Sequence, residues 1–115
     1  MHEISLVEGL LEQLRGLATE NNASKVISIT MEIGPLCGVV VDSFRFGFEV
    51  LSSEDNLFRD TELLIDVPEV DYTCTHCNHV LRTNGPKPSQ CPKCDDQILI
   101  PSGGDDLILK SVEIE

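Results

Sequence analysis

The sequence contains no tryptophan, only one tyrosine and four phenylalanines, and few basic residues. Eight lysines and arginines stand against twenty aspartates and glutamates among 115 residues, so the net charge is −12. This shortage argues against nucleic-acid binding, which needs positive charge for phosphates and aromatic rings for bases. No apolar run is long enough to span a bilayer, and the first residues lack the basic segment of a signal peptide. We therefore expect a cytoplasmic protein that binds neither nucleic acid nor membrane.

The catalytic patterns that we considered are missing too. The chain has no Ser-His-Asp order, no phosphate-binding loop and no zinc motif with three ligands and an open position. Because these patterns are missing, we expect a protein that is not an enzyme. The length of the chain suits one small domain, or two lobes that share a core.

What the sequence does have is cysteine at a characteristic spacing. Four of the five cysteines form two Cys-x-x-Cys pairs separated by thirteen residues, namely Cys74, Cys77, Cys91 and Cys94. Two such turns can bring four thiolates to one ion, and a tetrahedral set of thiolates suits Zn²⁺ while leaving no position open for chemistry. The separation is slightly shorter than the usual fifteen to twenty or so residues. The sequence therefore predicts a structural zinc site.

The four cysteines could serve other purposes. Disulfides require an oxidising compartment, and a redox-active pair usually accompanies a βαβ pattern, which flanks neither pair here. A four-cysteine iron site uses the same ligands and stays open as an alternative. A zinc enzyme would require one of the four to be dispensable for holding the metal. The fifth cysteine, Cys37, is expected to be a small apolar filler.

The first third of the chain predicts a helix and a strand. Ser5 and Glu8 have the spacing of a capping box, which predicts a helix start at Ser5 after a short lead-in. An apolar stripe follows at helical spacing, and Asn21-Asn22 ends it. Its members are Val7, Leu10, Leu11, Leu14, Leu17 and Ala18. From Lys25 the period changes to two, which predicts a half-buried strand. Its inward residues would be Ile27, Ile29, Met31 and Ile33.

The middle of the chain predicts a second helix and a second strand. Gly34-Pro35 breaks the first strand, and Asp42 or Ser43 can cap a helix with Phe44, Phe48 and Leu51 on one side. Residues 63–67 then alternate as a strand that Pro68 stops.

The last third predicts an inserted lobe and a final strand. The Cys-rich lobe follows from about Tyr72 and includes a short strand at 98–100. Residues 101–105 have the composition of a linker, and a last strand covers 107–115.

These elements predict an α+β fold in which two helices pack on a small sheet of about three strands, with an inserted zinc-ribbon lobe. One domain would comprise residues 1–70 plus 102–115, and the ribbon would comprise 71–101. We expect the strands at 63–67 and 107–115, which flank the ribbon, to pair with each other.

The N-terminus, Met1-His2-Glu3, is a candidate second metal site. The α-amino group, the His2 amide nitrogen and a His2 imidazole nitrogen can hold one ion in fused chelate rings. Such planar, nitrogen-rich sets favour Ni(II) or Cu(II). A histidine at position 2 is more often simply solvated, so the chelate is a hypothesis. Because the ligands must lose protons, binding should weaken as pH falls.

Together, the initial Met-His-Glu, the amphipathic first helix and the late cysteine pairs resemble the HypA/HybF family of nickel metallochaperones for hydrogenase maturation. The resemblance extends over essentially the whole chain. It includes Ile33-Gly34, Asp42-Ser43-Phe44 and Phe48-Glu49. Val40 departs from the family pattern, because many members carry an acidic residue there.

The resemblance implies nickel at Met1 and His2 with Glu3 in support, and structural zinc on Cys74, Cys77, Cys91 and Cys94. It implies that the chain delivers Ni(II) to the large subunit of [NiFe]-hydrogenase, often with a HypB-type GTPase. Some relatives also serve urease, and a second copy of the chain is a further candidate partner, which would form a dimer. The alternative functions are a zinc-ribbon adaptor and a nucleic-acid-binding module, both without nickel.

Overall fold

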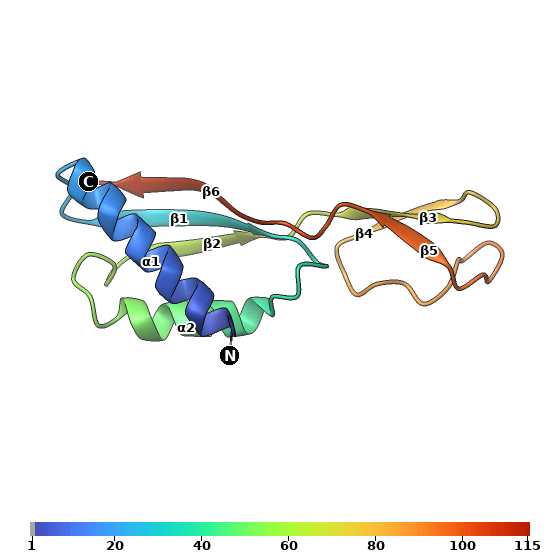
Figure 1. Cartoon of the computed structure of the whole chain (residues 1–115), viewed down its shortest axis with the longest axis horizontal. Helices are drawn as coiled ribbons and strands as arrows, with labels where there is room; N and C mark the ends of the chain where they lie inside the picture. Colours follow the sequence, from blue (N-terminus) through green and yellow to red (C-terminus); the bar gives the residue numbers. More distant parts are fainter. Residues whose placement is uncertain (1) are drawn as a thin grey trace.

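The computed structural model describes residues 2–115, and at His2 the description covers the backbone. This part of the chain contains two helices and six strands. They are α1 (His2–Glu20), β1 (Val26–Ile33), α2 (Val41–Ser52), β2 (Glu62–Asp66), β3 (Val70–Cys74), β4 (Val80–Thr83), β5 (Leu99–Ser102) and β6 (Leu107–Ile114). The strands form two three-stranded sheets at opposite ends of a molecule measuring 56 × 25 × 17 Å (Figure 1). The first sheet carries both helices, as the α+β prediction requires.

The order of strands in the first sheet is β2-β1-β6, so β1 lies at its centre. The predicted pairing between the two strands that flank the ribbon is wrong, because β1 separates β2 from β6. The chain passes from β1 to β2 through α2, and a crossover of that kind makes the two strands parallel. Strand β6 returns from the ribbon and pairs antiparallel with the other edge of β1.

The core of this lobe lies between the sheet and the helices. It includes most of the predicted stripe of α1 and the predicted phenylalanines of α2, with Leu17 and Leu51 partly buried beside it. Its buried members are Val7, Leu10, Leu11, Leu14, Val26, Ile29, Met31, Ile33, Phe44, Phe48, Phe58 and Leu63. The helical and strand periodicities therefore identified the core faces correctly, with one exception in β1.

That exception is Ile27, which was expected to point inward but is exposed, while Val26 is buried. The pairing of β1 with β6 shifts register between Val26 and Ser28, which is a β-bulge or similar irregularity. Such an extra residue reverses the alternation of side chains between the two faces of a sheet. The strict period of two therefore holds only from Ile29 onward.

Both predicted helix starts are wrong, and the reasons are tertiary. Helix α1 begins at His2, which places Ser5 inside the helix. Its first turn is held by contacts with α2, since Glu3 is buried and Ile4 packs beside Gly47. Helix α2 begins at Val41 after Val40, whose own side chain makes no capping hydrogen bond. Packing of this kind supplies most of the stability of helices in proteins and can override a local capping signal.

The second sheet has the order β4-β3-β5 and forms the lobe that contains the cysteine pairs. The predicted linker is shorter than expected, because residues 101 and 102 belong to β5. The segment after β1 and the segment that leads from β5 to β6 meet closely where Gly34 faces Gly104, and a methyl group at Gly34 would collide with the Gly104 carbonyl. The backbone N–H of Leu36 donates to that same carbonyl oxygen at 2.6 Å. Leu36 also packs against the buried cluster of the second lobe.

Candidate metal centre

The two cysteine pairs adopt the same local fold. The N–H of Asn78 donates to the Cys74 carbonyl at 3.0 Å, and the N–H of Asp95 donates to the Cys91 carbonyl at 2.9 Å. Asn78 and Asp95 have φ values of 62° and 64°, in the left-handed region that Asn and Asp tolerate better than most residues. Each turn therefore reverses the chain directly after its second cysteine.

Backbone N–H groups point at the first sulfur of each turn. His76 donates to Cys74 Sγ and Lys93 donates to Cys91 Sγ, both at 3.4 Å. The two donors occupy equivalent positions, two residues after the cysteine that accepts. Because a backbone N–H stabilises negative charge on sulfur, the contact from His76 favours the thiolate of Cys74.

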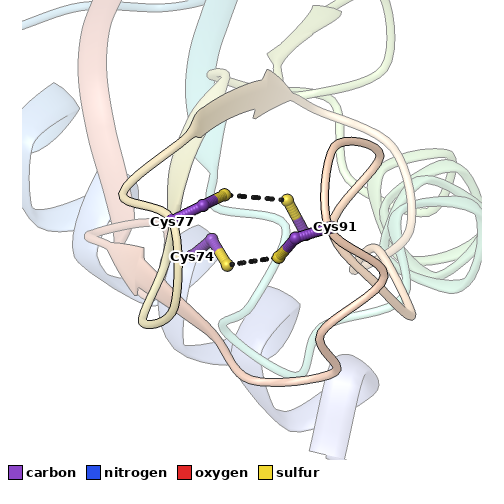
Figure 2. A group of neighbouring side chains, drawn as sticks. Cys74, Cys77 and Cys91 are labelled. Atoms are coloured by element: carbon purple, nitrogen blue, oxygen red, sulfur yellow. Dashed lines mark hydrogen bonds between the residues drawn. The ribbon is translucent and has the colours of Figure 1, made fainter.

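The two turns bring all four sulfurs together. Their Sγ atoms lie within 4.8 Å of one another, with Cys74 and Cys94 at 3.5 Å and Cys77 and Cys91 at 3.6 Å. Figure 2 shows the sulfurs of Cys77 and Cys91 pointing toward each other across the gap between the two turns. A disulfide would need about 2.05 Å, so the four are free thiols. Four sulfurs bound to Zn²⁺ at about 2.3 Å stand about 3.8 Å apart in a tetrahedron, close to the spacings observed here.

The pKa values of Cys74 and Cys94 shift in opposite directions. The N–H groups of Cys77 and His76 hold the pKa of Cys74 down to about 7. The N–H of Asp96 lowers the pKa of Cys94, but burial and the three neighbouring cysteines together raise it to about 12. One thiolate thus forms readily, whereas four thiolates this close require a cation to offset their repulsion.

The donor set therefore fits a tetrahedral metal ion. Cys74 and Cys91 are buried, Cys94 is partly buried and Cys77 is exposed, so the cluster extends from the interior of the ribbon to its surface. Among the side chains of residues 3–115, no other group of three or more His, Cys, Asp or Glu stands close enough to share an ion. Cys37 packs against the other lobe's core, away from the cluster.

The predicted nickel end is described only from its second residue. Met1 and the side chain of His2 lie outside the described residues, so their part in metal binding stays a prediction. Glu3 is buried, and its Oε2 accepts a hydrogen bond from the backbone N–H of Val40 at 3.3 Å. Val40 is the residue before α2, so the Glu3 carboxylate lies at the positive end of that helix.

Sequence reasoning missed two features of these sites. No local signal links Glu3 to Val40, because the two residues are 37 positions apart. The burial of Tyr72 was detectable in the sequence, because Val70, Tyr72 and Cys74 occupy alternate positions along β3, and all three are buried. The hydroxyl of Tyr72 has no hydrogen-bond partner among the described residues.

Comparison with known proteins agrees with this architecture. A family model described as hydrogenase/urease nickel incorporation, metallochaperone, hypA matches residues 1–114. The hydrogenase maturation factor HypA of Methanocella arvoryzae is 38% identical over 120 residues, covering 100% of this chain and 99% of that protein. That of Caldanaerobacter subterraneus subsp. tengcongensis is 31% identical and covers 100% of both chains.

Solved structures are similar as well. The solution structure of the Ni metallochaperone HypA from Helicobacter pylori superposes with a TM-score of 0.63 at 28% identity, covering 97% of this chain and 96% of that one. A second solution structure of a HypA protein gives a TM-score of 0.67 at 29% identity, with 100% and 97% covered. Among residues 2–115, no helix has the length and apolarity to cross a membrane.

Proposed function

This chain belongs to the HypA family of hydrogenase and urease nickel-incorporation metallochaperones, and from that premise we propose that it binds Ni(II) at its N-terminus and delivers it for maturation of [NiFe]-hydrogenase. The observation that carries the proposal is the match of residues 1–114 to a nickel-incorporation family, in a chain that begins Met1-His2-Glu3. Urease is a second candidate recipient, because the family description includes it.

The helix start at His2 supports the proposed nickel ligands. The first four N–H groups of a helix have no intrahelical partner, so the His2 amide is not committed to the hydrogen bonds of α1. The α-amino group of Met1, the His2 amide and the His2 imidazole would together form the chelate. Glu3 would support the site indirectly, since its carboxylate is engaged with Val40 and can hold the first turn of α1 against α2.

We assign a structural Zn(II) to Cys74, Cys77, Cys91 and Cys94. Bound there, zinc would crosslink the two turns and stabilise a lobe whose buried cluster is small. The division into residues 1–70 plus 102–115 and a ribbon at 71–101 belongs to the same proposal. In this proposal the chain is not an enzyme, acts in the cytoplasm, and works with a HypB-type GTPase and the hydrogenase large subunit.

The test is nickel binding by the protein with its native first residue. We expect His2→Ala, and separately an extension of two residues before Met1, to abolish tight Ni(II) binding measured by calorimetry. The extension leaves every side chain in place but moves the α-amino group away from the His2 amide, so it tests the chelate itself.

Zinc content serves as the internal control and should stay near one per chain in both variants, because its four ligands are unchanged. Full nickel affinity in the extended protein would exclude the N-terminal chelate. A native protein that bound zinc and ignored nickel would exclude the delivery function altogether.

A further inference from the structure

A groove between α2 and the segment that leads into β2 contains charged side chains of both signs. Helix α2 and its end contribute Arg45, Glu49 and Ser53, and the segment before β2 contributes Arg59 and Thr61. Residues four apart lie on the same side of a helix, so the three residues from α2 form one row along it. The groove has a volume of about 240 Å³. Sites for drug-sized ligands are larger, at about 300–1,000 Å³, so this groove suits a smaller molecule.

The two arginines of the groove are not used in ion pairs. The whole chain has only eight basic residues against twenty acidic ones. Arg15, Arg82 and Lys110 are each paired with an aspartate. Arg45 and Arg59 form no ion pair with any side chain of residues 3–115. Both guanidinium groups are therefore available to a ligand, although carboxylates outnumber them on this protein.

Arg45 is also held in position. It is half-buried, and its Nη1 donates to the backbone carbonyl of Leu63 at 3.3 Å. A guanidinium group carries five N–H donors in a rigid, planar fork, so one such bond leaves most of the fork free. That fork matches a carboxylate through two parallel hydrogen bonds. Arg45 and Arg59 therefore give the groove an end that can bind a carboxylate.

The charge of the protein favours a carboxylate over a phosphate group at this end. The chain has a net charge of −12 and repels every anion. A phosphate ester carries a charge of about −1.5 to −2 at pH 7, whereas a carboxylate carries a single charge. Because the repulsion is proportional to the charge of the ligand, a phosphate would be opposed almost twice as strongly.

Glu49 gives the groove a negative end. Its carboxylate forms no ion pair with any side chain of residues 3–115, although Arg45 lies one turn before it. The hydroxyls of Ser52 and Ser53 donate to the carbonyls of Glu49 and Val50, so their oxygens can only accept a bond from a ligand. The C-terminal end of a helix also favours a cation, and α2 ends at Ser52. This end of the groove therefore suits a positively charged donor, such as an ammonium group.

We propose that this groove binds a free α-amino acid, with its carboxylate on Arg45 and Arg59 and its ammonium group on Glu49. An α-amino acid contacts both ends at once and brings no net charge for the acidic protein to repel. Phe48 and Leu63 also line the groove, so an apolar side chain of the ligand suits it. No cysteine and no residue of the proposed nickel site lines the groove, so this inference does not depend on the proposed function.

The first experiment titrates the full-length, zinc-loaded, isotope-labelled chain with L-leucine and follows the backbone amides by NMR. Isocaproate is leucine without the amino group, and isoamylamine is leucine without the carboxylate. We expect leucine to shift amides of the groove, such as those of Ser53 and Thr61. Each analogue should bind at least tenfold more weakly, because it loses one charge-assisted contact. No shifts in the groove, or an analogue that binds as tightly as leucine, would overturn the proposal.

Variants test the carboxylate end of the site. Arg45→Gln and Arg59→Gln should each weaken leucine binding at least tenfold. Lys25→Gln is the matched control, because it removes the same charge from an exposed residue outside the groove, and it should bind leucine normally. Arg59 is exposed, so its variant keeps the test valid if Arg45→Gln loses stability with its bond to Leu63. Equal affinities for the Arg59→Gln and Lys25→Gln chains would overturn the proposal.

The ammonium end is tested by combining a variant with an analogue. Glu49→Gln should weaken binding of leucine but not of isocaproate, because only leucine has an ammonium group to lose a contact. Removing the negative charge should even strengthen isocaproate binding. A Glu49→Gln chain that binds leucine as tightly as the native chain would exclude the proposed position of the ammonium group.

Discussion

The carboxylate of Glu3 accepts a hydrogen bond from the backbone N–H of Val40, and this contact joins the first turn of α1 to the start of α2. The contact stabilises both helices at once. It lets α1 begin at His2 and satisfies a donor at the end of a helix that has no side-chain cap. Glu3 thus has a structural role that is independent of any metal.

We expect Glu3→Ala to lower the free energy of unfolding by about 1–3 kcal/mol, since it leaves a partly buried N–H without its acceptor. Glu3→Gln should cost less, because the amide oxygen can still accept the bond. Urea denaturation of the three proteins measures the difference. Equal stability of the alanine variant and the native chain would show that the contact contributes nothing.

Removal of one buried ligand tests the metal centre. Cys91→Ala should release the metal and expose residues 71–101 to protease, because three thiolates cannot close the tetrahedron. Cys37→Ala is the matched control, since Cys37 contacts the core of the other lobe, and it should keep the metal. Metal analysis and limited proteolysis provide the readouts. A Cys91→Ala protein that kept its metal and its cleavage pattern would argue against a four-cysteine site.

For the buried hydroxyl of Tyr72 we expect that its removal does not destabilise the protein. Tyr72 is fully buried, and its OH has no partner in the described part of the chain. Tyr72→Phe should therefore be neutral or stabilise the protein by up to about 1–3 kcal/mol, the cost of an unsatisfied buried group. Tyr72→Ala should destabilise it by about 3–5 kcal/mol through the cavity it leaves. Thermal unfolding separates the two, and a strongly destabilised Phe variant would mean that the hydroxyl is bonded.

Two glycines with opposite surroundings test the close contact between Gly34 and Gly104. Gly34→Ala should be destabilising, because the added methyl meets the Gly104 carbonyl, a backbone atom that cannot move cheaply. Gly16→Ala lies on α1 with nothing within 4 Å of its Cβ, and it should stabilise the protein by about 0.5–1 kcal/mol. Denaturant unfolding of both variants gives the sign of each change in stability, and a stabilising Gly34→Ala would show that the two backbone segments do not meet there.

The ion pair between Arg15 and Asp55 predicts a dependence on pH. The N–H of Leu57 and the Arg15 guanidinium lower the pKa of Asp55. A lowered carboxyl pKa contributes stability above its unfolded value of 3.8, and that stability is lost as pH falls through the folded value. Because Arg15 is about half exposed, solvent screening limits the effect. Asp55→Asn should cost about 0.5 kcal/mol at pH 7 and nothing near pH 2, as measured by unfolding at both values. An equal cost at both would exclude the ionic contribution.

Local patterns in the sequence were sufficient for both helices, for four of the six strands and for the cluster of four cysteines, whereas β3 and β4 were not predicted. The spacing of Cys74, Cys77, Cys91 and Cys94 encodes two short turns, and each turn needs only contacts within about five residues to form. The apolar stripe of α1 and the alternation of β1 after Ile29 likewise depend on side chains within a few turns or pleats. Such signals can be recognised in the sequence because they arise from interactions between residues that are close in the chain.

Tertiary structure decided everything that depends on distant segments. Three features depend on contacts with residues far along the chain: the central place of β1 between β2 and β6, the bulge that turns Ile27 outward, and the start of α1 at His2, where Glu3 and Ile4 contact α2 and the residue before it. Helical spacing placed Phe44 and Phe48 on the inner side of α2 without Phe46, and the structure leaves Phe46 exposed. The physical reason is that the spacing of residues along the chain determines which side chains lie on the same face of a helix or strand. Which other element covers that face depends on the free energy of the whole fold.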